Sequence, residues 1–466
     1  MLGINKIYMR ELRYNYTFMM LIAINIIFIF CLVNGYHIPQ FYFIGTLISL
    51  ILFYLFFEKP RYIAPLIVLM IPLEISKLFI PVLKVIEGPS GDVSVLDFSR
   101  IMVGLSIVVW FVKDLSNREL LFFKDTIMGY LSIFVVYCMF STLFISADIN
   151  RGLIELFRYS IYLIMAFICI RFINHKNDVL LVYKFLFIIS SILSLVGIAE
   201  YLFEFHLWNE HLGIRSSATF MDPNLYARFL SLTLISTIIF KIKKIRFNNI
   251  LLNILIIIQI VALFVSVSRG GLLAFLLGLL FVVFFIDRNI RLKLFPFILG
   301  TLVLVPFVFL ILIKARGEDL SFFDMGQRIG LIYTGVKIFL HNLILGIGLG
   351  SFETIALGSY AKFLPYGGRG VTLSHTSVVT VMAELGSIGL GIVCMIFYKI
   401  YATFRQLLNS KDAWISTFSL LAATQILIVF ISSQSAGRMF EDPFLWFFIG
   451  VLISINKINK AAISCG

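Results

Sequence analysis

Charged residues are scarce in this sequence. Asp, Glu, Lys and Arg make up 14% of its 466 residues, whereas a soluble domain carries about 25%. Hydrophobic residues account for 60%, and they gather in runs long enough to cross a bilayer. The low charge content excludes an ordinary soluble domain and indicates a protein that crosses a membrane many times.

Cysteine is scarce as well, and it forms no metal or disulfide pattern. No two of the five cysteines form a Cys-x-x-Cys pair, and most lie inside apolar runs: Cys31, Cys138, Cys169, Cys394 and Cys465. We therefore expect neither a disulfide framework nor a cysteine metal site. The formal net charge is +13, but no basic stripe with interleaved aromatic residues accompanies it, so we expect no nucleic-acid partner.

The apolar runs predict an all-α protein, because a helix is the only unclosed element whose backbone is satisfied within a bilayer. With about 20 residues needed for each crossing, we expect a polytopic bundle of about 12–14 transmembrane helices. The spans lie near residues 17–34, 41–57, 62–83, 96–112, 126–145, 153–173, 179–204, 224–241, 250–267, 271–287, 294–313, 377–402, 414–433 and 443–457.

The distribution of Lys and Arg among the loops predicts the orientation. With a cytoplasmic N-terminus, alternation places most basic clusters on the cytoplasmic side, as the topology rule requires. The acidic loop 87–97, which has no Lys or Arg, falls outside. No small-residue cleavage site follows the first apolar run, so we expect a signal anchor and two cytoplasmic termini.

One connection is long. Residues 314–376 form an extracytoplasmic loop, and within it the segment 327–340 places Ile329, Ile332, Val336 and Leu340 at spacings of three and four. This stripe, opposite Arg328 and Lys337, predicts a helix at the membrane interface with its apolar face toward lipid or the bundle.

Three arginines lie in outward loops, where the topology rule disfavours them. Arg215 follows a Gly-Ile pair, Arg269 lies in the turn SVSRGG, and Arg316 begins the long loop. Each side chain either reaches lipid headgroups from the interface or binds an anion. Arginine keeps its charge and binds phosphate in a bidentate manner, so together they favour an anion site at the outer surface.

A glycine-rich segment, HNLILGIGLGSFE at 341–353, is similar to a dinucleotide-binding loop at first sight. It lacks the last glycine of G-x-G-x-x-G, no strand precedes it, and it falls outside the cell. We interpret Gly346, Gly348 and Gly350 as a close-packed turn.

The segment SHTSVVTVMAELGSIG, at 374–389, begins a span. His375 lies at the start of that span, where a helix cap or surface position is the simplest interpretation. Glu384 lies nine residues along the helix and faces nearly the opposite way. A carboxylate inside an apolar helix is expensive and needs a partner.

Taken in order, RSSATFMDPN, SVSRGG, QRIGL, GIGLGSF and SHTSVVTVMAELGSIGL resemble the O-antigen ligase and polymerase superfamily of membrane glycosyltransferases. The resemblance covers roughly residues 195–400. It divides the chain into N-terminal helices at 1–195, a ligase/polymerase-type region at 196–402 that includes the loop 314–376, and C-terminal helices at 403–466.

The resemblance implies a function at the outer face of the bacterial cytoplasmic membrane. The family transfers glycans from undecaprenyl diphosphate to a lipid or glycan acceptor. By this resemblance, Arg215 and Arg269 bind the diphosphate, with Arg316 and Arg328 as weaker candidates. His375 takes the role of general base, and Glu384 joins it as a candidate catalytic residue.

The expected chemistry is a metal-independent, inverting transfer without a cofactor. Diphosphate is a good leaving group, and the chain has no Asp-x-Asp pair of the kind that holds a metal-bound nucleotide sugar. Polymerisation of lipid-linked repeat units is the first hypothesis, and ligation to lipid A-core is the alternative. A lipid-linked oligosaccharide flippase is a third possibility, although its ionisable residues would be expected near mid-membrane in matching halves.

Overall fold

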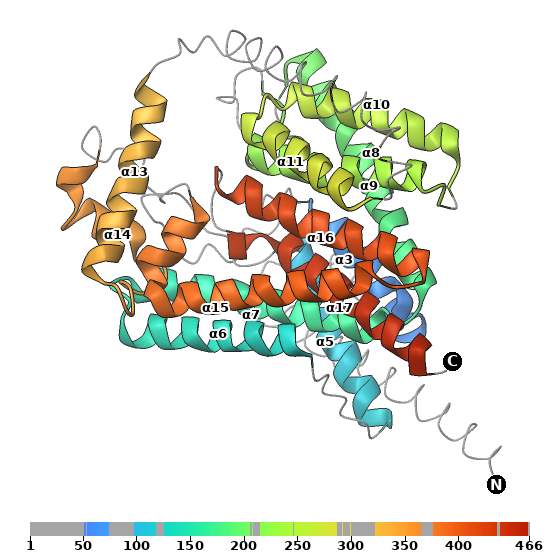
Figure 1. Cartoon of the computed structure of the whole chain (residues 1–466), viewed down its shortest axis with the longest axis horizontal. Helices are drawn as coiled ribbons and strands as arrows, with labels where there is room; N and C mark the ends of the chain where they lie inside the picture. The colour runs from blue at the N-terminus through green and yellow to red at the C-terminus, as the bar shows by residue number, and fades with distance from the viewer. Residues whose placement is uncertain are drawn as a thin grey trace, which may run out of the picture. The chain divides into compact units, whose positions relative to one another are not determined.

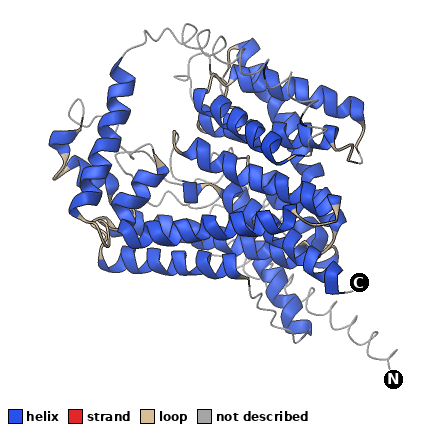
Figure 2. Ribbon diagram, in the orientation of Figure 1, coloured by secondary structure: helices blue, strands red, loops and turns tan. Residues whose placement is uncertain are grey.

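The computed structural model describes residues 51–52, 54–73, 97–117, 125–205, 207, 215–245, 247–286, 291, 299, 322–364, 376–435 and 439–464. These residues form helices and no strand, which confirms the all-α class (Figure 2). Seven of the described helices are long and apolar enough to cross a membrane. The expected span 17–34, Arg316 and His375 lie outside the described residues.

The chain divides into two compact units. One unit comprises Met1–Ile63 and Gly104–Leu121, and the other comprises Ala64–Val103 and Phe122–Gly466. In the first unit, a short 3₁₀ helix, η1 (Pro60–Tyr62), is followed by the start of α3 (Ile63–Met70). The ammonium group of Lys113, in α5 (Phe98–Asn117), lies 5.4 Å from the centre of the Phe57 ring.

The second unit holds long helices whose starts follow the expected spans to within four residues, while α15 and α17 end six and seven residues later than expected (Figure 1). Their bounds are α6 (Thr126–Phe144), α7 (Ile149–Phe172), α8 (Lys176–Phe203), α9 (Pro223–Ile242), α10 (Asn249–Val265), α11 (Arg269–Phe285), α15 (Ser377–Leu408), α16 (Ala413–Ser433) and α17 (Pro443–Ser464). Many begin at an Asp, Asn or Ser whose side chain accepts a backbone N–H, as Asp125, Asp148, Asp222, Asn248 and Asp412 do.

Hydrogen bonds and ion pairs join neighbouring helices at both ends of the second unit. At one end, which we call the basic end, Lys176 pairs with Asp412 and Ser410 bonds to Asn459. Burial acts to raise the pKa of Asp412, but hydrogen bonds from Lys176 and the Trp414 backbone outweigh it, so this pKa lies below its ordinary value.

The opposite end, which we call the serine-rich end, contains the turns 145–148, 215–222, 266–268 and 439–442 and the start of α15. The backbone N–H of Met439 donates to the Ser377 hydroxyl at the start of α15. The backbone N–H of Ser216 donates to the Val265 carbonyl at 3.1 Å. The Ser377 hydroxyl donates to the Ser433 carbonyl at 3.0 Å. These contacts join turns that the loop charges predict to share one side of the membrane.

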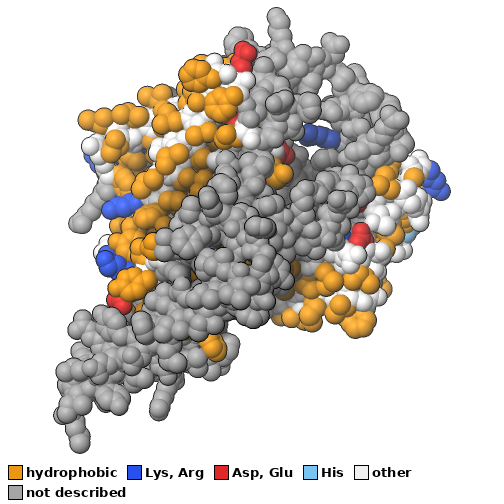
Figure 3. All heavy atoms as spheres, turned by 180° about the vertical axis from the view of Figure 1, so that it is seen from behind, with side chains coloured by type: hydrophobic (Ala, Val, Ile, Leu, Met, Phe, Trp, Pro, Cys, Tyr) orange, Lys and Arg blue, Asp and Glu red, His pale blue; other side chains and the backbone are white. Residues whose placement is uncertain are grey.

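Large apolar side chains cover the outward faces of several helices. Ile133 and Val136 of α6, Ile188 and Ile192 of α8, and Ile257 of α10 are all exposed. Figure 3 shows hydrophobic side chains gathered over the described parts of one face. Such faces are expected of helices that contact lipid.

Two buried glutamines link four helices through hydrogen bonds. Gln425 of α16 accepts from the Tyr183 hydroxyl at 2.9 Å and donates to the Ser236 hydroxyl at 2.8 Å. Gln259 of α10 donates to Ser190 at 2.9 Å and accepts from Thr237 at 3.1 Å. In an apolar setting such polar pairs hold helices together.

The helix expected at 327–340 is present as α13 (Phe322–His341). It buries Leu331 and Ile338 in a cluster with Phe352 and Ala383. The stripe expected to face lipid or the bundle is mostly uncovered, since Ile329 and Leu340 are 61% and 52% exposed. A different face of α13, with Leu331 and Ile338, therefore packs against the bundle. The position of the exposed stripe at the membrane interface stays a prediction.

Replacing Gln425 with leucine should lower the stability of the purified protein by about 1 kcal/mol, because Tyr183 and Ser236 lose their shared partner. Thermal unfolding in detergent measures the effect. Tyr183→Phe should cost little more in the Gln425→Leu background, since that hydroxyl has already lost its acceptor. Fully additive losses would contradict the shared hydrogen bond.

Candidate functional site

The segment that carries Arg215 is held by a buried carboxylate. Glu200, in the last turn of α8, is fully buried. Its Oε2 accepts the backbone N–H groups of Ser217 at 2.9 Å and Ala218 at 2.6 Å, and its Oε1 accepts that of Leu207 at 3.2 Å. Ala218 has a φ of 49°, in the left-handed region. The carboxylate thus stabilises a strained turn directly after Arg215.

The turn that carries Arg269 is also strained and tightly packed. Val267 has a φ of 50°, which is unusual for a β-branched residue. Ser268 caps α11 by accepting the N–H of Gly271 at 3.2 Å. A Cβ on Gly271 would lie 2.4 Å from the Cβ of Ala227, so only glycine allows α11 to approach α9 this closely.

One amide connects the two arginine segments. The Oδ1 atom of Asn224, in the first turn of α9, accepts from Arg215 Nη2 at 3.2 Å. The same oxygen accepts from the Ser268 hydroxyl at 2.8 Å. Ser268 directly precedes Arg269, so Asn224 joins the Arg215 side chain to the turn that carries Arg269.

Other arginines at the serine-rich end pair with carboxylates. Arg228 pairs with Asp442, and both side chains are buried. Arg158 bonds to Glu441 at 3.2 Å, and Arg151 pairs with Glu353. Sequence reasoning missed these partners and Asn224. The repeated Asp-Pro at 222–223 and 442–443, each opening a helix, was the available signal.

The glycine segment is the close-packed turn that the sequence predicts. Gly346, Gly348 and Gly350 have φ values of 73°, 94° and 78°. Added Cβ atoms would lie within 2.7 Å of backbone atoms of Glu384, Ser146 and Gly152, respectively. The turn is thus pressed against α15 on one side and against the α6–α7 connection on the other.

This turn supplies backbone hydrogen-bond partners where α15 is interrupted. Gly386, with a φ of 64°, breaks the helix, which frees backbone groups on either side. The N–H groups of Ile347 and Gly348 donate to the carbonyls of Ala383 and Glu384 at 3.0 and 2.9 Å. In the other direction, the N–H of Ser387 donates to the Leu343 carbonyl at 2.8 Å.

Glu384 lies beside this interruption, and its side chain is buried. Its Oε1 accepts the backbone N–H of Phe352 at 3.1 Å, at the start of the short helix α14 (Phe352–Leu357). The carboxylate that sequence analysis selected thus bonds to the backbone at the end of the glycine segment.

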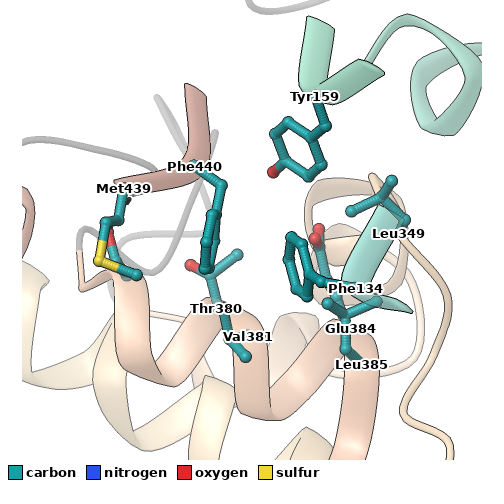
Figure 4. Close-up of a pocket in the computed structure, with 10 residues that line it drawn as sticks. Phe134, Tyr159, Leu349, Thr380, Val381, Glu384, Leu385, Met439 and Phe440 are labelled. Carbon is teal, nitrogen blue, oxygen red and sulfur yellow. Dashed lines mark hydrogen bonds between the residues drawn. The ribbon is translucent and has the colours of Figure 1, made fainter. Parts of the chain in front are cut away.

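A pocket of about 300 Å³, including space open to the surface, lies next to Glu384. Figure 4 shows the Tyr159 and Phe134 rings, from α7 and α6, lining it beside Phe440. The Phe134 and Phe440 rings pack together with their centres 4.2 Å apart. Thr380 and Glu384 contribute oxygen atoms from one face of α15. Ser377, the first residue of α15, also lines this pocket.

The remaining candidate, Arg328, is exposed on α13. Among the described residues, no hydrogen bond or ion pair joins it to Asn224 or Ser268. The structure therefore joins Arg215 to the turn that carries Arg269, and it places Glu384 beside the pocket at the same end of the bundle.

Residues 254–394 match a family model described as O-antigen ligase. No curated protein matches the chain. The matched segment covers less than a third of the sequence. It contains Arg269, the glycine turn and Glu384, whereas Arg215 and Asn224 precede it.

Gly348→Ala should destabilise the protein by at least about 1 kcal/mol, because its φ disfavours any side chain and the new Cβ would lie 2.2 Å from Ser146 Cα. Thermal unfolding of the purified variant measures this loss. The matched control is Gly391→Ala, also in the membrane bundle, where a Cβ meets nothing within 4 Å. Equal melting temperatures for the two variants would show that the turn is not close-packed.

Proposed function

We propose that the protein transfers a glycan from undecaprenyl diphosphate to an acceptor, since residues 254–394 match a family model described as O-antigen ligase. The reaction takes place at the outer face of the bacterial cytoplasmic membrane. Polymerisation of lipid-linked repeat units is the favoured activity, and ligation to lipid A-core is the alternative. The region 196–402 carries the catalytic machinery.

The observation that carries this proposal is the connection of Arg215 to the Arg269 turn through Asn224. Arg151, Arg158 and Arg228 have carboxylate partners that offset their charge. Arg215 bonds to the amide oxygen of Asn224, in the first turn of α9. The same oxygen bonds to the Ser268 cap of α11, the helix that Arg269 begins. Guanidinium groups on two segments joined in this way suit a diphosphate.

These arginines stabilise the transition state of the transfer more than they stabilise the bound substrate. When the bond between the anomeric carbon and the diphosphate breaks, negative charge grows on the leaving phosphate. Fixed guanidinium groups stabilise that charge more in the transition state than in the bound substrate. The leaving group is already a good one, so the transfer needs no general acid and no metal ion.

The acceptor hydroxyl must lose a proton as it attacks the anomeric carbon. His375 is the proposed general base, because a neutral imidazole accepts a proton near pH 7. Attack from the face opposite the diphosphate inverts the anomeric centre. Glu384 is a second proposed catalytic residue; it lines the pocket and bonds to the backbone at the end of the glycine turn. Arg328 and Arg316 are secondary candidates for contacts with the diphosphate.

Purified protein supplied only with lipid-linked repeat units should produce a ladder of lengthening glycans. No second acceptor is present, so a ladder requires that one repeat unit is transferred to another. Gel analysis of the labelled glycan separates the outcomes. If the glycan is not extended but is transferred once lipid A-core is added, the protein is a ligase and not a polymerase.

Arg269→Ala should reduce glycan transfer at least roughly 100-fold, the typical effect of removing one donor to a developing charge. Protein level and membrane insertion should stay unchanged. Arg405→Ala is the matched control, because Arg405 lies in the last turn of α15, where its guanidinium packs over the Phe285 ring. Normal transfer by the Arg269 variant would remove this residue from the diphosphate site.

A further inference from the structure

We propose that Asn224 is a positioning residue that sets the distance between the two diphosphate-binding arginines. The inference rests on the proposed function and deepens it. Asn224 contacts the side chain of Arg215 and the cap of the helix that Arg269 begins. It acts on the ligand through these groups.

The Asn224 carbonyl oxygen has room for two hydrogen bonds, and both are made. Arg215 Nη2 donates to it at 3.2 Å, and the Ser268 hydroxyl donates at 2.8 Å. A carbonyl oxygen carries two lone pairs, so these donors use its full capacity. Asn224 therefore ties the two segments at a single atom.

Asn224 itself occupies a rigid place in the chain. It follows Pro223, whose ring fixes φ at the first residue of α9. Its backbone N–H donates to the Asp222 side chain at 2.7 Å. The amide therefore projects from a fixed helix start, and it can hold a flexible arginine in one rotamer.

The backbone of the Arg215 segment is fixed independently. Glu200 binds the N–H groups of Ser217 and Ala218, and Ser216 N–H donates to the carbonyl of Val265 at the end of α10. Glu200 thus fixes the backbone beside Arg215, and Asn224 fixes the guanidinium group of Arg215. Both ends of the side chain are set before a ligand arrives, which lowers the entropy lost on binding.

Ser268 extends this control to the second arginine. Its hydroxyl accepts the Gly271 N–H as the helix cap while donating to Asn224. A shift of Asn224 would therefore move the start of α11, where Arg269 lies. An anion that spans two phosphates needs both cations at a defined spacing, and this network supplies it.

A double-mutant cycle tests the proposal. The probe is undecaprenyl diphosphate without glycan, and its affinity is measured for detergent-purified wild type, Asn224→Ala, Arg215→Ala and the double variant. Asn224→Ala should weaken binding about tenfold. In the Arg215→Ala background the same change should have a clearly smaller effect, because one of the groups it positions is gone. Asn248→Ala, which removes a cap at the start of α10, should bind like the wild type.

The outcomes separate the positioning role from the proposed function. A wild type that does not bind the probe overturns the proposed function and this inference with it. Binding that Arg215→Ala weakens but Asn224→Ala leaves intact overturns the inference alone. An equal loss from Asn224→Ala in both backgrounds would mean that Asn224 does not act through Arg215, and that overturns its role in setting the distance between the two arginines.

A second variant covers the case in which Asn224→Ala does not fold. Asn224→Asp keeps both acceptor bonds but adds a negative charge beside the diphosphate. Its affinity relative to wild type should therefore recover as salt concentration rises, because repulsion is screened while the geometry is intact. A deficit that does not change with salt would contradict the proposal.

Discussion

A backbone N–H or C=O group that leaves a helix within a membrane must find a partner in the protein, because hydrocarbon offers none. Each irregular segment at the serine-rich end meets this requirement. Glu200 accepts the N–H groups after Arg215, Ser268 caps the helix of Arg269, and the glycine turn bonds to α15 across Gly386. The candidate site is built from the segments where the helices stop, and its geometry follows from how their backbone groups are satisfied.

The partners of the arginines determine what each can do. A carboxylate partner offsets the charge of Arg228, Arg158 and Arg151, so those pairs join α9 and α7 to the turns beside them. Arg215 bonds to the Asn224 amide oxygen, which also accepts from the Ser268 cap. The same end of the bundle therefore contains both ion pairs and the Arg215 segment that we propose binds the diphosphate.

The sequence predicts the helices well because a membrane-spanning run depends mainly on local composition. It also predicts the close-packed glycine turn, since positive φ values and tight contacts need glycine. The contacts of Asn224, Glu200 and Glu353 could not be predicted, because their partners depend on how the helices pack. The stripe on α13 shows the same limit: its period identified the helix, but packing selected Leu331 and Ile338 as the buried face. His375 and Arg316 remain predictions from the sequence.

The contact between the glycine turn and the α6–α7 connection has a consequence for the order of assembly. The Ser146 hydroxyl donates to the Leu349 carbonyl, and these residues are separated by 203 positions in the chain. At a synthesis rate of about 5–20 residues per second, the α6–α7 hairpin waits roughly 10–40 s for its partner. The hairpin can enter the membrane early, but its polar tip is completed only after the ribosome has made the glycine turn. Assembly of this end is therefore a late event in the biogenesis of the protein.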